Sequence, residues 1–122
     1  MENESSNEIQ AEIDAFINKI QKWRDFFDFQ VKIYFDGWAI SLREKNLYPR
    51  LIIIFKSFEN KLYSLKSFEV HLKDYQHEEF KEIYSVDNID NLDTLVVELK
   101  EIIYGKDLMK EVSKIYKNAF IK

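Results

Sequence analysis

The strongest constraint on the fold is a pair of short segments that flank Asp36 and Gly37. Both segments alternate apolar with other residues, and the apolar ones are Val31, Ile33 and Phe35 before the turn and Trp38, Ile40 and Leu42 after it. A period of two is typical of a β-strand, and Asp-Gly is a favoured two-residue hairpin turn. The sequence therefore predicts a β-hairpin in which Phe35 lies opposite Trp38 and each apolar pair shares one face. We expect Trp38 to lie in the core.

The following segments extend this hairpin into a sheet. Residues 50–58 contain an apolar run without alternation, which predicts a central strand that is covered on both faces. Residues 62–72 return as a fourth strand, and the apolar parity changes near Lys66 and Ser67, which predicts a bulge or a break there. The pattern of residues 75–86 does not decide between a short helix and an edge strand.

Helical spacing of apolar residues marks both ends of the chain. Apolar side chains at positions i, i+3, i+4 and i+7 predict a helix over residues 6–26. The same spacing predicts a helix over residues 92–103, with Asp90 or Asn91 as its N-cap and Gly105 as its left-handed stop.

A further amphipathic helix is predicted over residues 107–120. The complete prediction is an α+β fold with an N-terminal helix, a four-stranded antiparallel meander sheet and two C-terminal helices packed on one sheet face. A chain of 122 residues has little room for a second core, so residues 1–122 are expected to form a single domain. We expect residues 1–5 to be disordered.

The composition excludes several classes of protein. The chain has no cysteine, so disulfides, thiolate zinc sites and cysteine nucleophiles are excluded. The only glycines are Gly37 and Gly105, so there is no glycine-rich phosphate loop. The longest apolar run, residues 51–55, is far shorter than the roughly 20 residues that span a bilayer, and no secretory signal is visible. We therefore expect a cytoplasmic protein with no cofactor and no membrane association.

Two motifs resemble sites of metal chemistry, but neither has the required arrangement. His71, Asp74 and His77 form an H-x-x-D-x-x-H pattern, whose spacing does not secure convergence of three ligands on one ion. Glu59 begins an E-x-K element like that of metal-dependent nucleases, with Asp36 as the upstream acid. Both fall at predicted hairpin tips instead of on rigid strands. We therefore predict no metal site, no catalytic residue and no enzymatic activity.

Charge is distributed in blocks along the chain. Residues 74–104 carry nine acidic and two basic side chains, whereas residues 30–73 carry four acidic and eight basic ones. Val97 and Tyr104 lie about 100° from the main apolar arc of their predicted helix, and Phe26 lies outside the arc of the first helix. Acidic groups beside exposed apolar side chains favour docking on a basic protein surface. The predicted partner-binding residues are Glu78, Glu79, Asp87, Val97, Tyr104 and Phe26.

The outer face of the first hairpin supports an alternative. Lys32, Tyr34 and Arg43 place two cations and an aromatic ring on that face. Proteins that bind single-stranded nucleic acid use such surfaces to hold phosphates and to stack bases. The net charge of −4 argues against this alternative for the chain as a whole.

The function that these observations favour is non-catalytic protein binding. Small, acidic domains without catalytic motifs are similar in kind to the inhibitors with which phages and viruses block host defence, anti-CRISPR proteins included, and to bacterial immunity proteins. Secretion chaperones belong to the same class. Lysine outnumbers arginine by 15 to 3, and alanine, glycine and proline are scarce, as expected for an AT-rich genome such as that of many phages. The predicted partner is a protein with a basic surface.

Overall fold

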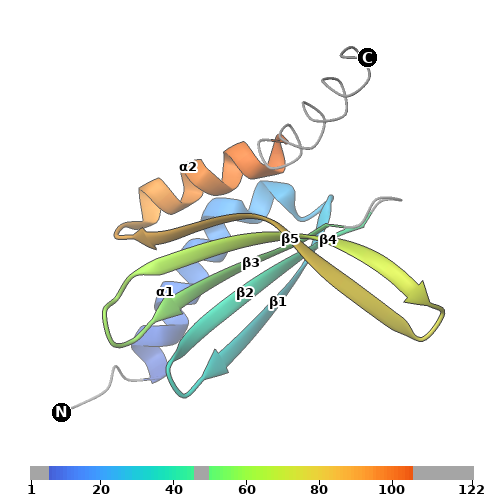
Figure 1. Ribbon diagram of the computed structural model, residues 1–122. Helices are drawn as coiled ribbons and strands as arrows, with labels where there is room; N and C mark the ends of the chain where they lie inside the picture. Colours follow the sequence, from blue (N-terminus) through green and yellow to red (C-terminus); the bar gives the residue numbers. More distant parts are fainter. Residues whose placement is uncertain (1–5, 46–49, 106–122) are drawn as a thin grey trace.

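One antiparallel sheet with two helices on one face forms the described part of the protein. The computed structural model describes residues 6–45 and 50–105. Its elements are α1 (Ser6–Ile20), the 3₁₀ helix η1 (Gln21–Trp23), β1 (Phe27–Tyr34), β2 (Gly37–Glu44), β3 (Arg50–Ser57), β4 (Tyr63–Asp74), β5 (His77–Ile89) and α2 (Leu92–Ile103). The sheet order is β1-β2-β3-β4-β5, and every neighbouring pair is antiparallel. Figure 1 shows α1 and α2 on the same face of this sheet, which we call the helix face; the opposite face is the outer face. The predicted α+β class and meander order are confirmed.

The prediction of four strands is wrong, because most of the segment that was left open forms a fifth strand. β5 pairs with β4 in a hairpin that extends beyond the ends of β1, β2 and β3 (Figure 1). Residues 77–82, which form its first half, are all exposed. A strand exposed on both faces has no hydrophobic period, so nothing in the pattern of residues 75–86 distinguished a strand from a short helix.

The first hairpin has the predicted faces but not the predicted register. Tyr34 lies opposite Gly37 and Ile33 opposite Trp38, so Phe35 and Asp36 form the turn. The prediction that Phe35 pairs with Trp38 is therefore wrong, and the Phe35 side chain is fully exposed. The shift is an even number of residues, which keeps every side chain on its predicted face. Trp38 is fully buried, as predicted.

Gly37 is needed for close packing between strands and not for the turn. A Cβ atom at this position would overlap the carbonyl oxygen of Lys56 and the ring of Phe55, both on β3. Glycine within a strand often marks such a close approach of another backbone. The Asp-Gly pair therefore indicated the hairpin correctly but misplaced its turn.

The first helix is shorter than predicted. α1 ends at Ile20, whose φ of −107° and ψ of 7° leave the helical region, and η1 follows. Phe27 already lies in β1, opposite Glu44. The sequence spacing extended the helix too far because Phe27 stands four residues after Trp23 and therefore fits the helical template by coincidence.

The core lies between the helix face and the two helices. Along β3, residues that face the helices are buried and the residues between them are half-buried. The prediction that both faces of this strand are covered is therefore fully met only on the helix face. The bulge predicted near Ser67 is confirmed by a shift of register between Ser67 and Phe68. The largest fully buried side chains are those of Trp38, Phe16, Phe27, Ile13, Ile20, Ile40, Leu42, Ile52, Ile54, Leu65, Leu95 and Leu99.

α2 begins and ends as the sequence predicts. The Asn91 side chain accepts a hydrogen bond of 2.8 Å from the backbone N–H of Thr94, which is the expected N-cap contact. Gly105 has a φ of 107° and ends the helix in the left-handed region. The helix predicted over residues 107–120 and the disorder predicted for residues 1–5 fall outside the described residues.

Candidate protein-docking site

Three of the predicted partner-binding residues lie close together. The side chains of Phe26, Val97 and Tyr104 are 62%, 56% and 69% exposed. Phe26 and Tyr104 line a hollow of about 520 Å³ between η1, the end of β2 and the end of α2. Tyr104 and Val97 line a second hollow of about 510 Å³ on α2. Because Tyr104 lines both hollows, the three side chains form one surface, which we call the apolar junction.

Arg50, the first residue of β3, holds the end of α2 beside the sheet. Its buried guanidinium donates hydrogen bonds to the carbonyl oxygens of Ile102 (2.7 Å) and Ile103 (3.2 Å) and lies 3.4 Å from the carboxylate of Glu44. These carbonyls belong to the last turn of α2, where a cation also complements the helix dipole. Arg50 thereby sets the position of Tyr104 one residue beyond the helix. We did not predict this role, although an arginine that opens an apolar strand is an unusual feature of the sequence.

The charged side chains around the apolar junction are balanced in sign. Lysines and carboxylates occur there in equal numbers. They are Lys22, Lys45, Asp25 and Glu44 at the first hollow and Lys100 and Glu101 at the second. The local contribution of the apolar junction to binding is therefore burial of apolar surface, and any steering by charge must come from more distant acidic groups.

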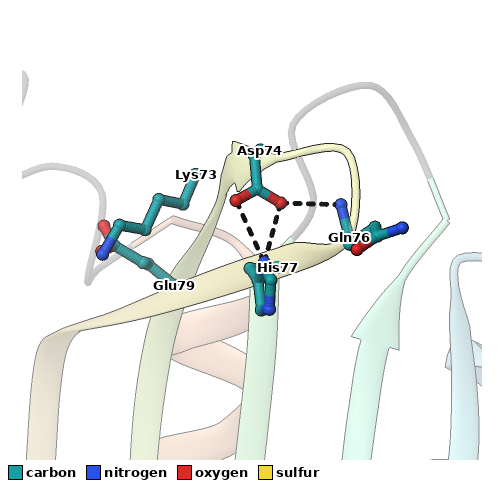
Figure 2. Close-up of polar contacts among 5 residues, drawn as sticks. All are labelled: Lys73, Asp74, Gln76, His77 and Glu79. Carbon is teal, nitrogen blue, oxygen red and sulfur yellow. Dashed lines mark hydrogen bonds and ion pairs between the residues drawn. The ribbon is translucent and has the colours of Figure 1, made fainter.

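The predicted acidic residues are not gathered at one place. Glu78 and Glu79 lie near the tip of the β4–β5 hairpin, whereas Asp87 lies near the other end of β5, eight to nine residues further along the strand. Glu79 lies 3.5 Å from the ammonium group of Lys73 (Figure 2). Glu78 forms an ion pair with Arg43. The negative charge of both glutamates is therefore partly neutralised within the molecule.

The ion pair between Arg43 and Glu78 also shows how the long hairpin is shaped. Arg43 lies on the outer face of β2, and two strands separate β2 from β5 in the sheet. Glu78 can reach Arg43 only if the far half of the hairpin bends over the outer face. Val70, which lies on the outer face of this part of β4, is buried. The pair thus joins a residue of the predicted protein-binding set to one of the predicted nucleic-acid set.

The three residues of the predicted nucleic-acid face do lie together. Lys32, Tyr34 and Arg43 line one hollow of about 330 Å³ on the outer face. Asp28 lines the same hollow, and its carboxylate would repel phosphate. With Arg43 paired to Glu78, the charge of the hollow is close to neutral.

Hydrogen bonds at the hairpin tip hold one carboxylate in its ionised form. Figure 2 shows the Asp74 carboxylate accepting from the backbone N–H of Gln76 (2.9 Å) and contacting Nδ1 of His77 (2.8 and 3.0 Å). The contact with Gln76, followed by that with His77, lowers the pKa of Asp74 below its usual value. The contacts that favour the ionised form are therefore retained at neutral pH and are lost as the pH falls through this lowered pKa. They stabilise the turn of the β4–β5 hairpin.

The histidine motif does not bring its three possible ligands together. His71 contacts Glu69 at 3.2 Å, whereas His77 contacts Asp74. Over residues 6–45 and 50–105, no group of three or more histidines and carboxylates could hold a metal ion. The remaining candidates, Asp36 and Glu59, are exposed in the turns that follow β1 and β3.

A polar cluster beneath α1 is a structural feature that we did not predict. The carboxylate of Glu12 accepts a hydrogen bond of 2.8 Å from the indole N–H of Trp38 and one from the ammonium group of Lys56. The Lys56 ammonium also lies 5.2 Å from the centre of the Tyr63 ring. These contacts attach α1 to the sheet. The signal in the sequence is that Glu12 lies at the edge of the apolar stripe of α1, one turn before Phe16.

Comparison with known proteins gives no further guide to function. No protein-family model, no curated protein and no solved structure matches the chain. Among the helices of the described residues, none is long and apolar enough to cross a membrane.

Proposed function

We propose that this chain is a non-catalytic protein-binding domain that docks on a basic partner protein through the apolar junction. The observation that carries this proposal is the clustering of Phe26, Val97 and Tyr104, which stay exposed around two adjoining hollows. Large exposed apolar side chains that are grouped in this way favour a protein interface. A few aromatic side chains that pack into pockets usually contribute most of the binding energy of such an interface. An inhibitor of the anti-defence or immunity-protein kind would act by such docking.

The acidic block supplies the second part of the proposal. Residues 74–104 carry a net charge of −7, and a negative field of this kind speeds the approach of a basic partner more than it adds to affinity. The apolar junction would then supply the contacts that hold the complex together. Charge is therefore expected to act on association, and the apolar junction on dissociation.

The Tyr104→Ala variant should dissociate from the partner about tenfold faster, or more, than the parent chain, because it removes the side chain that both hollows share. The partner is first isolated with immobilised full-length chain from the native host, and rates are then measured by surface plasmon resonance. The Glu78→Lys, Glu79→Lys double variant should instead bind more slowly, with weaker dependence on salt.

A matched control distinguishes a partner site from a surface that the chain itself covers. Tyr75→Ala removes a tyrosine that is even more exposed, at the hairpin tip, and should leave both rates unchanged. Tyr104→Ala should also change the free energy of unfolding by no more than about 0.5 kcal/mol. A larger loss of stability would mean that another part of the chain packs on Tyr104. Unchanged dissociation would place the interface elsewhere.

Single-stranded nucleic acid binding is a second candidate, because Lys32, Tyr34 and Arg43 line one hollow. If these groups neutralise two phosphates, affinity for an oligonucleotide should fall about tenfold between ~50 and ~200 mM salt. The Glu78→Gln variant should bind more tightly than the parent, because it releases Arg43. Fluorescence polarisation with labelled RNA and DNA measures both effects. Absence of binding at low salt, for the parent and for Glu78→Gln, would exclude this candidate.

A further inference from the structure

The two edges of the sheet differ in how well they are protected against pairing. β5, at one edge, pairs with β4 through three irregularities of register and contains Asn88 at a φ of 60°. Such bulges twist an edge and oppose the addition of another strand. β1, at the other edge, pairs with β2 without a shift over all eight of its residues and contains no proline. A regular edge strand with unpaired backbone groups is a template for a further strand.

The backbone groups that β1 offers at this edge follow from its pairing with β2. The N–H of Lys45 donates to the carbonyl oxygen of Phe26, so these two residues form a hydrogen-bonded pair next to the strand. Such pairs alternate along an antiparallel ladder. The backbone groups of residues 28, 30, 32 and 34 are therefore turned toward β2, and those of residues 27, 29, 31 and 33 are turned toward the open edge.

The side chains at the same edge are only half covered. On the helix face of β1, Phe27 is buried and Phe29 packs against the core, but Val31 and Ile33 are 38% and 56% exposed. Thus one half of the strand is well covered on this face and the other half is only partly covered. An antiparallel copy of the same strand would place Phe29 beside Val31 and Phe27 beside Ile33 on one face.

The charges of β1 select that register. With Gln30 opposite itself, Asp28 of each copy lies opposite Lys32 of the other, on the outer face. Opposite charges in directly facing positions stabilise a strand pair. This register uses every edge-facing residue from Phe27 to Ile33, whereas a shift by one pair would place Asp28 opposite Tyr34. In the single chain the carboxylate of Asp28 lies 3.7 Å from the ammonium group of Lys45 and stays largely exposed.

We propose that β1 pairs with β1 of a second copy of this chain, antiparallel about a two-fold axis at Gln30, so that two five-stranded sheets form one continuous sheet. The residue pairs that face each other are then self-complementary, as an isologous interface requires. The proposal does not depend on the proposed function: the first hollow of the apolar junction adjoins β1 at Phe27, but the strand pairing rests on the open backbone edge of β1 and on the Asp28 and Lys32 charges. Lys32, which would otherwise protect the edge, serves in the dimer as the partner of Asp28.

Charge reversal and exchange test the proposed register. Sedimentation equilibrium of the full-length chain should give twice the monomer mass at high concentration. The Lys32→Asp variant faces Asp28 with a like charge at two symmetric places, so its dimer dissociation constant should rise about tenfold or more. The double variant Asp28→Lys, Lys32→Asp exchanges the charges and should restore the dimer. Lys81→Asp, the matched reversal on the other edge strand, should leave the dimer unchanged.

Cysteine crosslinking provides a second test that does not depend on charge. The natural chain has no cysteine, so a single introduced thiol can only pair with that of another copy. Residues that face each other as a non-hydrogen-bonded pair have Cα atoms about 4.5 Å apart, which a disulfide can bridge. Gln30→Cys should form a covalent dimer on mild oxidation, whereas Tyr34→Cys, far from the axis, should not.

Three results would overturn the proposal. They are a monomer at every concentration, a dimer that Lys32→Asp does not weaken, and crosslinking of Tyr34→Cys in preference to Gln30→Cys. Far-ultraviolet circular dichroism confirms that each variant is folded before its mass is measured. The charge exchange keeps the composition of the strand, so its recovery of the dimer cannot arise from a general effect on folding.

Discussion

Replacing Trp38 with alanine should lower the free energy of unfolding by about 3–5 kcal/mol, the usual range for emptying a large aromatic site in a core. The Trp38 side chain is fully buried and lies between the rings of Phe16 and Tyr63, with centroids 6.2 and 6.1 Å away. Its indole N–H also donates to Glu12, so the variant loses packing and a charge-assisted hydrogen bond together. Denaturant unfolding followed by circular dichroism measures the change.

The matched control is Phe35→Ala, an aromatic residue of the same hairpin. The sequence alone paired it with Trp38, but the structure places it fully exposed in the turn. This substitution should change stability by no more than about 0.5 kcal/mol. If both variants lost the same free energy of unfolding, the result would favour the register in which Phe35 and Trp38 face each other and would contradict the structure.

The second large effect is expected at Arg50. The Arg50→Met variant keeps an apolar stem of similar length but leaves the carbonyl oxygens of Ile102 and Ile103 without this donor and removes the cation that faces Glu44. Removing one member of a buried ion pair costs about 3–5 kcal/mol. The remaining Glu44 keeps 15% of its side chain exposed at the first hollow, so we expect a loss at the lower end of this range. Thermal and denaturant unfolding should both show the loss.

Arg43→Met is the control for Arg50→Met, because it removes an arginine of the same sheet whose ion pair with Glu78 is partly exposed. Exposed pairs contribute at most about 1 kcal/mol. A cost for Arg50→Met as small as that for Arg43→Met would mean that Arg50 does not hold α2 in place. In that case the position of Tyr104 at the apolar junction would need another explanation.

The sequence was most informative where one face of an element is buried. The amphipathic stripe of α2, its Asn91 cap and its Gly105 stop were predicted, as was the bulge near Ser67, because each leaves a local pattern. β5 was not predicted as a strand, because its first half is exposed on both faces and has no period. The register of the first hairpin was also missed. Contact between Gly37 and β3 decides it, and no local rule describes such a contact.

The candidate site was also predictable only in part, because local patterns mark its residues but contacts between distant residues bring them together. The sequence showed that three apolar side chains lie outside the apolar stripes of their predicted helices, namely Phe26, Val97 and Tyr104. The predicted helix around Phe26 nevertheless extended too far. Their proximity was not visible, because it depends on Arg50, which is separated from Ile102 by 52 positions. The separation of Asp87 from Glu78 and Glu79 likewise follows from the length of β5, an element that the sequence left open.

The meander order of the sheet has a consequence for how the chain reaches this structure. Every strand pairs with its neighbour in the sequence, so each pairing closes only a short loop and loses little chain entropy. Among the described residues, longer loops must close for the contacts of α1 and α2 with each other and with distant strands, and for the ion pair between Arg43 and Glu78. Topologies dominated by short loops fold faster than those that depend on distant pairings. The two helices, at opposite ends of the described chain, are the part of this fold whose assembly requires the largest search.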